Sequence, residues 1–201
     1  MLETLVQQAL GNSALELAAV VLAIAYLLLA VRENSLCWIM AAGSTAIYFF
    51  VFLDAKYYME TALQVFYFGM AIYGWYEWRY GGQGGDGVPI STWTGRQHGA
   101  ALLAIALATG TSTWLLSTFT DAHLPLIDSF TTWSAVVTTF MVARKVLENW
   151  IYWFVIDAVS IYLYLDRALY FTSALFAIYL IIILFGFAAW LKTWRAQQAS
   201  V

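Results

Sequence analysis

Long runs of apolar residues alternate with short polar breaks along this chain of 201 residues. A helix needs about 20 mostly apolar residues to cross the hydrocarbon core of a bilayer, and these runs have about that length. They predict seven transmembrane helices, at about residues 14–31, 36–53, 57–78, 99–119, 128–143, 149–165 and 168–191. A glycine-rich stretch at about residues 80–97 is the expected linker between the third and fourth helices. The fold class is therefore expected to be all-α, with one transmembrane domain over residues 1–201.

The second half of the chain repeats the first at a shift of 112 positions without a gap. The shift places Arg32, Trp38, Tyr58, Tyr67, Gly74 and Trp78 on Arg144, Trp150, Tyr170, Tyr179, Gly186 and Trp190. Repeat 1, at about 14–79, thus matches repeat 2, at about 126–191, and the helix at about 99–119 is a connector. Because an odd connector brings the second repeat in with the same orientation, we expect a parallel 3+1+3 repeat. Such repeats build two halves around a central site, which suits transport.

Composition supports the membrane assignment and narrows the chemistry. The chain is 63% hydrophobic and only 10% charged, more apolar than a soluble domain of this size. A single cysteine, Cys37, excludes a disulfide framework or a cysteine metal cluster within one chain. The only histidines, His98 and His123, lie in or beside loops, and no metalloprotease motif is present. We therefore expect no enzymatic activity, no metal and no cofactor.

The distribution of basic residues predicts the orientation in the membrane. Seven lie in the breaks after the first, third and fifth helices or in the C-terminal tail, namely Arg32, Arg79, Arg96, Arg144, Lys145, Lys192 and Arg195. The opposite side has only Lys56 and Arg167. Because cytoplasmic loops carry the excess of Lys and Arg, the N-terminus is expected outside and the C-terminus in the cytoplasm. Residues 1–13 lack a basic segment, so we expect no cleavable signal peptide.

Polar side chains at membrane depth indicate the candidate site, because each costs free energy unless it is paired or faces water. One helical stripe on the third span contains Glu60, Gln64, Tyr67, Trp75 and Trp78. A second stripe on the sixth span contains Trp150, Trp153, Asp157, Ser160 and Tyr164. The predicted substrate-binding residues are Glu60, Gln64, Tyr67, Trp75, Trp150, Trp153, Asp157 and Ser160. Indole faces and a buried carboxylate suit a flat cationic ring, and Gln or Ser would orient it by hydrogen bonds.

Other roles are open for several of these residues. Trp38, Trp78, Trp190 and Trp194 have the positions of an interfacial aromatic belt. Glu77 and Glu148 stand beside basic residues, where ion pairing is the simpler interpretation. An alternative role for Glu60 is to extend to the outer surface of the membrane. An alternative role for Asp157 is a structural hydrogen bond between helices.

Several motifs resemble the PnuC family of vitamin transporters. They are Gln-Val-Phe at 64–66, Ile-Tyr-Gly-Trp-Tyr-Glu-Trp at 72–78, Arg-Lys-Val-Leu-Glu-Asn-Trp-Ile-Tyr-Trp at 144–153 with Ser160 after it, and Asp-Ser at 128–129. The resemblance covers about residues 15–195. It implies a seven-helix fold related to the SWEET sugar transporters and import of nicotinamide riboside by facilitated diffusion. It also implies a homotrimer and a cytoplasmic kinase that traps the imported substrate.

Two departures from the family pattern concern the substrate. Nicotinamide riboside members tend to carry Asn at the positions of Ala71 and Asp157, and many have a small or neutral residue at Glu60. Relatives in the family also carry thiamine, another aromatic cation, so thiamine is an alternative substrate. A proton-coupled symporter is a further alternative, because Asp157 or Glu60 has a titratable group. A retinal photoreceptor lacks support, since Lys192 lies at the end of the last helix, and no channel filter sequence is present.

Overall fold

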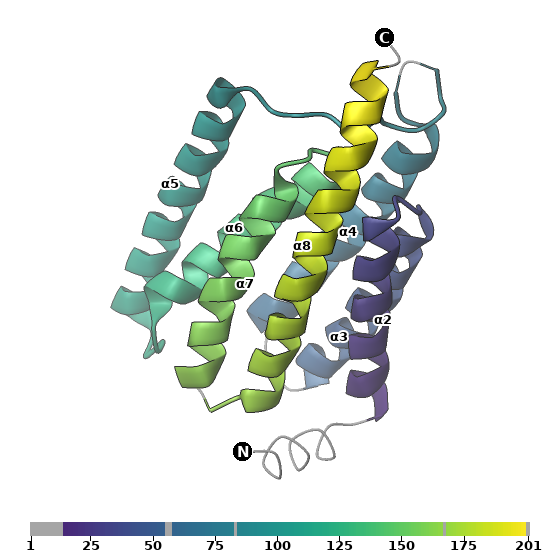
Figure 1. Ribbon diagram of the computed structural model, residues 1–201. Helices are drawn as coiled ribbons and strands as arrows, with labels where there is room; N and C mark the ends of the chain where they lie inside the picture. Colours follow the sequence, from purple (N-terminus) through teal and green to yellow (C-terminus); the bar gives the residue numbers. More distant parts are fainter. Residues whose placement is uncertain (1–13, 55–57, 83, 167, 200–201) are drawn as a thin grey trace.

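The computed structural model describes residues 14–54, 58–82, 84–166 and 168–199, which fold into seven helices (Figure 1). They are α2 (Ala14–Val31), α3 (Leu36–Asp54), α4 (Tyr58–Tyr80), α5 (Gly95–Phe119), α6 (Pro125–Ala143), α7 (Asn149–Asp166) and α8 (Tyr170–Ala199). The expectation of an all-α chain with seven helices is confirmed. The first 13 residues, to which the signal-peptide prediction refers, lie outside the described residues.

Four of the seven helices, α3, α5, α6 and α8, are long and apolar enough to cross a membrane by length and composition alone. Helices α4 and α7 have 23 and 18 residues. Both carry acidic, amide and many tyrosine or tryptophan side chains, which lower the mean hydropathy of a helix. The polar stripes expected from the sequence lie on these two helices.

Three helix ends differ by three residues or more from the predicted ones, for local physical reasons. Helix α5 begins at Gly95 rather than 99, because Thr94 and Gln97 form a capping box that satisfies free backbone N–H groups. Helix α6 begins at Pro125 rather than 128, since proline has no N–H to leave unsatisfied in the first turn. Helix α8 continues to Ala199 beyond the end of its apolar run, because no glycine or proline interrupts residues 187–199.

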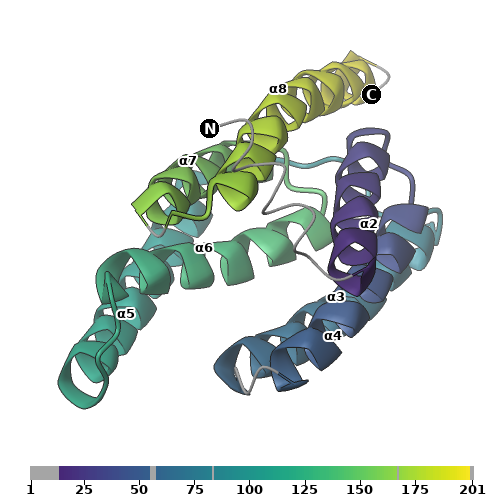
Figure 2. The same ribbon diagram turned by 90° about the horizontal axis from the view of Figure 1, so that it is seen from below.

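The helices form two groups, which contact each other at two helix–helix interfaces. Helices α2, α3 and α4 pack together, α6 packs on α7, α7 packs on α8, and α5 packs on α6 (Figure 2). Contacts between the groups run from α2 to α8 and from α4 to α6. In each case the first helix of one group packs on the third helix of the other. We refer below to the residues of α2–α4 as the first half and to those of α6–α8 as the second half.

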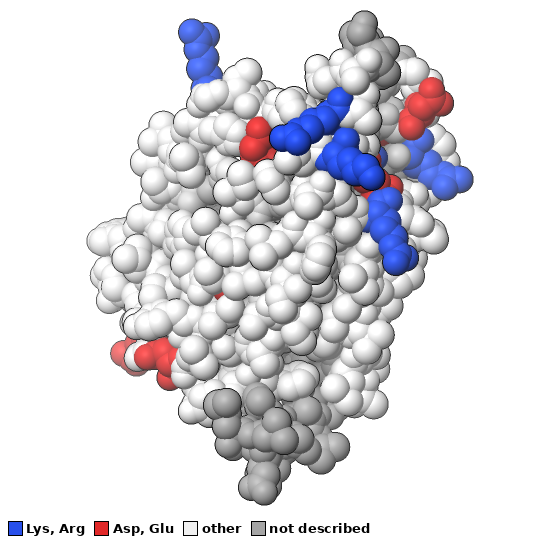
Figure 3. All heavy atoms as spheres, in the orientation of Figure 1, with Lys and Arg blue, Asp and Glu red and all other residues white. Residues whose placement is uncertain are grey.

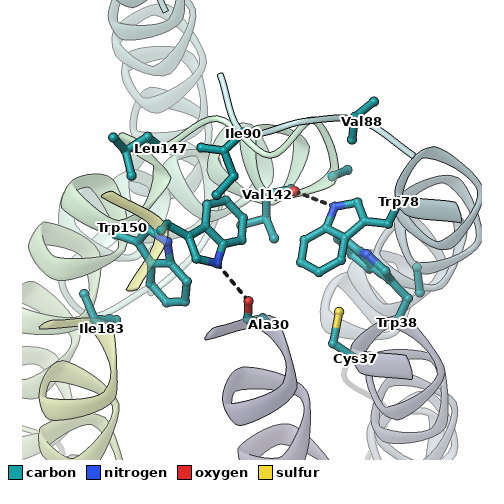
Figure 4. Packing of buried hydrophobic residues seen from close by; sticks show 13 residues of the cluster. Ala30, Cys37, Trp38, Trp78, Val88, Ile90, Val142, Leu147, Trp150 and Ile183 are labelled. Carbon is teal, nitrogen blue, oxygen red and sulfur yellow. Dashed lines mark hydrogen bonds between the residues drawn. The ribbon is translucent and has the colours of Figure 1, made fainter. Parts of the chain in front are cut away.

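Two tryptophans join the halves by matching hydrogen bonds. The indole Nε1 of Trp78 on α4 donates to the carbonyl oxygen of Val142 at the end of α6, at 3.0 Å. The indole Nε1 of Trp190 on α8 donates to the carbonyl oxygen of Ala30 at the end of α2, at 2.9 Å (Figure 4). The two donors, Trp78 and Trp190, are 112 residues apart, and so are the two acceptors, Ala30 and Val142. Positions that the sequence shift relates therefore make equivalent contacts across the interface.

The same correspondence extends to the aromatic packing at this end. Trp38 and Trp78 make an edge contact with ring centroids 5.6 Å apart, and Trp150 and Trp190 do so at 5.4 Å. Trp78 and Trp190 are themselves 5.8 Å apart, so the four rings form a continuous row across both halves. All four are buried. An interfacial belt is therefore the wrong interpretation for Trp38, Trp78 and Trp190, since a belt faces lipid headgroups.

The described basic residues lie at the end of the molecule that carries the C-terminus. Arg32, Arg79, Arg96, Arg144, Lys145, Lys192 and Arg195 all fall at helix ends or in connections on that side (Figure 3). Glu77 there pairs with Arg144, with 3.3 Å between the Arg144 Nη1 and the Glu77 Oε1 atoms, as expected for an ion pair. Glu148 lies 3.9 Å from His98 and accepts the backbone N–H of Trp93 at 3.3 Å. The contact between Glu148 and Trp93 connects the segment after α4 to the residue that precedes α7.

Candidate functional site

A central cavity of about 190 Å³ lies between the two halves. Helices α2, α3 and α4 line it from one side, and α6 and α7 line it from the other. The residues that surround it are Ala23, Tyr26, Trp38, Ala41, Ser44, Thr45, Tyr67, Thr139 and Trp153. Two of the predicted site residues, Tyr67 and Trp153, thus face one space from opposite halves. A cleft that both halves line is the usual position of a substrate site in repeat-built transporters.

The hydroxyl groups around the cavity are set up to accept hydrogen bonds. Ser44 donates its own proton to the carbonyl oxygen of Ala19 at 3.0 Å. Thr45 donates to the carbonyl oxygens of Ala41 and Ala42 one turn earlier, at 3.0 and 3.1 Å. Because these protons are committed to helix carbonyls, the oxygen lone pairs remain free to accept from a donor in the cavity. Such a lining suits a ligand that carries hydroxyl or amide N–H groups.

Asp157 lies on α7 one helical turn beyond Trp153, on the same face of that helix. It is only 4% exposed, and its carboxylate makes no hydrogen bond or ion pair with the described residues. The Asp157 carboxylate lies close enough to Tyr179 on α8 to interact with it electrostatically. Tyr48 on α3 also interacts with Tyr179. Ser160, on the next turn of that face, is also buried. A buried acid without an ion-pair partner is costly unless a cation pairs with it, so Asp157 is the strongest candidate to bind positive charge.

Asp157 and Ser160 are not among the described residues that line the central cavity, and Gln64 also lies elsewhere. Gln64 lines a separate groove of about 240 Å³ between α3 and α4, with Thr45, Phe49 and Phe68 among its neighbours. This groove opens on the outer face, because Phe50 beside it is 66% exposed. Glu60 falls on α4, but its side chain lies outside the described residues. The structure therefore does not bring Gln64 into the central cavity.

The predicted tryptophans divide between two roles. Trp153 lines the cavity, whereas Trp150 is buried in the row of four tryptophans. Trp75 is half-buried and makes an edge contact with Tyr80 at 5.6 Å, near the end of α4. Trp150 and Trp75 therefore contribute to packing in this conformation, and Trp153 is the predicted tryptophan that lines the cavity.

Sequence reasoning missed several cavity residues. Tyr26, Trp38, Ser44, Thr45 and Thr139 line the cavity but were outside the predicted set. Thr45 had a usable signal, because the shift of 112 positions places it on Asp157. The others lie on helices whose stripes are apolar or only weakly polar, so their spacing did not single them out. Among the described residues, no group of three or more His, Cys, Asp or Glu side chains is placed to hold a metal ion.

Comparison with known proteins places this arrangement in a family. The model of a family described as nicotinamide mononucleotide transporter matches residues 13–192. The riboflavin/roseoflavin transporter RibM of Streptomyces davaonensis is 27% identical over 137 residues, which span 66% of this chain and 63% of that protein. The nicotinamide riboside transporter PnuC of Escherichia coli is 22% identical over 175 residues, with 73% and 72% coverage.

A solved structure supports the same fold. The crystal structure of the vitamin B3 transporter PnuC matches with a TM-score of 0.73 at 21% identity, covering 96% of this chain and 88% of that one. At this identity the likeness establishes the fold alone. The family model covers nearly the whole described chain, and the fold agrees with it. This chain therefore belongs to the nicotinamide mononucleotide transporter family, the PnuC family of membrane vitamin transporters.

Proposed function

We propose that the chain carries a small cationic aromatic vitamin precursor, with nicotinamide riboside as the first candidate, across the bacterial cytoplasmic membrane by facilitated diffusion. The observation that carries the proposal is the buried carboxylate of Asp157, which has no partner among the described residues and lies one turn from the cavity indole of Trp153. The pyridinium ring of nicotinamide riboside is flat and positively charged, so it can stack on an indole while a carboxylate balances its charge. The hydroxyl groups of Ser44 and Thr45, which line the cavity from the first half, can accept hydrogen bonds from the ribose hydroxyls.

The relatives name two substrates, and the charge of the site discriminates between them. PnuC of Escherichia coli is a nicotinamide riboside transporter, and RibM is a riboflavin/roseoflavin transporter. Riboflavin has a neutral ring system, so a buried carboxylate cannot form an ion pair with it. Thiamine, the alternative expected from the sequence, has no support among these relatives. Asp157 therefore favours the cationic substrate over the flavin.

We further propose that the halves are two parallel repeats, at about 14–79 and 126–191, with the helix at about 99–119 as the connector. The reciprocal Trp78 and Trp190 hydrogen bonds support this. A cavity of about 190 Å³ is smaller than most ligand sites, which have about 300–1,000 Å³, so the halves must move apart to admit a nucleoside. Rocking of the halves about the cavity would expose it alternately to each side.

The basic end of the molecule is proposed to face the cytoplasm, with the C-terminus inside and the N-terminus outside, because cytoplasmic loops are enriched in Lys and Arg. The relation to SWEET transporters, the homotrimer and the trapping kinase, which the family resemblance implies, stay predictions.

A flux experiment tests the mechanism. Purified protein in vesicles without ATP, coupling ions or membrane potential is expected to equilibrate labelled nicotinamide riboside and not to concentrate it. Unlabelled substrate placed inside is expected to accelerate entry of label by exchange, because a carrier returns faster when loaded. Protein-free vesicles provide the baseline. Concentrative uptake that requires a proton or sodium gradient would overturn facilitated diffusion and make Asp157 or Glu60 a coupling site.

Substitutions of Trp153 test the stacking contact. Trp153→Ala is expected to weaken binding of nicotinamide riboside by roughly threefold to thirtyfold, since a cation–π contact contributes about 0.5–2 kcal/mol. Trp153→Phe should lose less, because phenylalanine retains a weaker π-face. Trp114→Ala, on the exposed face of α5, is the control and should bind like the parent. Isothermal titration of the purified variants measures the difference, and equal losses for Ala and Phe would indicate packing instead of stacking.

A further inference from the structure

The hydrogen bonds between the halves end on carbonyl groups that already have a partner. The carbonyl oxygen of Ala30 accepts the backbone N–H of Glu33 at 3.0 Å as well as the indole of Trp190. The carbonyl oxygen of Val142 accepts the backbone N–H of Lys145 at 3.0 Å as well as the indole of Trp78. Each indole therefore binds the turn that ends the first helix of the opposite half. Separation of the halves at this end must break both bonds.

An ion pair connects the same two turns. Lys145 Nζ lies 3.2 Å from Glu33 Oε2, and both side chains are largely shielded from solvent. Glu33 and Lys145 are separated by 112 residues and both have a positive φ, 54° and 48°. Lys145 Nζ also lies 4.9 Å from the centre of the Trp78 ring, in the position of a cation–π contact. One turn of each half thus carries one charge of the pair.

These contacts lie between the central cavity and the basic end of the protein. Trp38 lines the cavity and makes an edge contact with Trp78, which continues through Trp190 to Trp150. Gly74 and Gly186 leave room for Trp38 and Trp150, because an added Cβ would stand 2.3 and 2.5 Å from their rings. The buried tryptophan row therefore closes the cavity on the side of the basic residues.

We propose that the two indole–carbonyl bonds and the Glu33–Lys145 pair form a latch that closes the cytoplasmic exit of the cavity and opens when substrate is released inward. The inference rests on the proposed function for the meaning of opening, whereas the contacts between the halves are present in the structure. Each contact is modest, so the latch can break and re-form during transport. Each half contributes one indole donor, one carbonyl acceptor and one charge of the ion pair.

The only cysteine of the chain reports the state of the latch. Cys37 begins α3 beside Trp38 and is fully buried, so a maleimide can react with it only after this end opens (Figure 4). We expect Trp78→Phe and Trp190→Phe each to accelerate labelling of Cys37 in the purified protein by roughly tenfold, the effect of one lost hydrogen bond. Trp150→Phe is the matched control. This substitution replaces an indole of the same row by a smaller ring. It removes no hydrogen bond, because the Trp150 indole N–H has no partner among the described residues.

A charge exchange tests the ion pair independently of ring size. Glu33→Lys and Lys145→Glu alone each place like charges together and should accelerate Cys37 labelling. The double variant Glu33→Lys with Lys145→Glu restores opposite charges and should return labelling towards the parental rate. Because the positions are related by the shift, the ammonium group introduced by Glu33→Lys would lie by Trp190 as that of Lys145 lies by Trp78. Thermal unfolding of each variant checks that folding is retained.

The outcomes separate the latch from the proposed substrate. Unchanged labelling in both Trp78→Phe and Trp190→Phe, or an equal increase in Trp150→Phe, would overturn the latch. Failure of the double charge variant to slow labelling relative to both single variants would also contradict it. Absence of nicotinamide riboside binding by the parental protein would overturn the proposed function, while the labelling rates would still report the latch.

Discussion

Replacement of Asp157 by asparagine is expected to weaken binding of nicotinamide riboside by roughly tenfold to a hundredfold. The buried carboxylate has no partner among the described residues, so a bound cation would supply the missing charge. A hydrogen bond or contact to a charged group contributes about 1.5–3 kcal/mol, which corresponds to this range. Titration of the purified protein, followed by intrinsic tryptophan fluorescence, measures the change, since Trp153 lies one turn away.

Two comparisons make the Asp157 result specific. Asp166→Asn neutralises another carboxylate on the same helix, at its far end, where it lies 3.4 Å from His123. This control should bind nicotinamide riboside like the parental protein. Riboflavin binding, if present, should change little in Asp157→Asn because the flavin ring is neutral. An Asp157→Asn variant that binds nicotinamide riboside as tightly as the parent, or more tightly, would show that the acid does not pair with this cation.

Replacement of Gly186 by alanine is expected to destabilise the folded protein by about 1–3 kcal/mol, the usual cost of overpacking a core. An added Cβ would lie 2.5 Å from the ring of Trp150, and that ring is held between Gly186 and Trp190. Gly74→Ala should have a similar effect, because its Cβ would lie 2.3 Å from the ring of Trp38. Thermal unfolding of the detergent-purified variants, monitored by circular dichroism, measures the shift in the transition midpoint.

Gly110→Ala is the control for this prediction. Position 110 lies within helix α5 and has no atom within 4 Å of an added Cβ. Alanine there should leave the midpoint unchanged or raise it slightly, since alanine favours helix over glycine by up to about 1 kcal/mol. The double variant Gly186→Ala with Trp150→Leu should lose less stability than the sum of the two single losses, because leucine removes the clashing ring. Equal midpoints for Gly186→Ala and Gly110→Ala would exclude close packing at Gly186.

The helices were predictable because their signals are local. Each apolar run is bounded by a polar break, and the seven runs correspond to the seven helices of the described chain. The early start of α5 was also readable, because Thr94 and Gln97 have the spacing of a capping box. It was missed because the run of apolar residues begins later. The extension of α8 has no stop signal in the sequence, so an apolar criterion ended that helix too soon.

The site was less predictable, because residues of one stripe have different surroundings. Trp150 and Trp153 are three residues apart on α7, yet one is buried in the tryptophan row and the other lines the cavity. Gln64 and Tyr67 are three residues apart on α4, yet they line different hollows. A stripe covers a wide arc of a helix, and the neighbouring helices decide which part of that arc meets an empty space.

The sequence by itself determined the seven helices and the membrane character, because periodicity and composition act within each segment, and it predicted a relation between positions 112 residues apart. It also singled out Asp157 as an acid at membrane depth, and the structure shows that this side chain is buried. Only the tertiary structure decided that Trp78 and Trp190 bind the carbonyl groups of Val142 and Ala30. Such contacts depend on which helix of one half packs on which helix of the other, and no local pattern along the chain encodes that pairing.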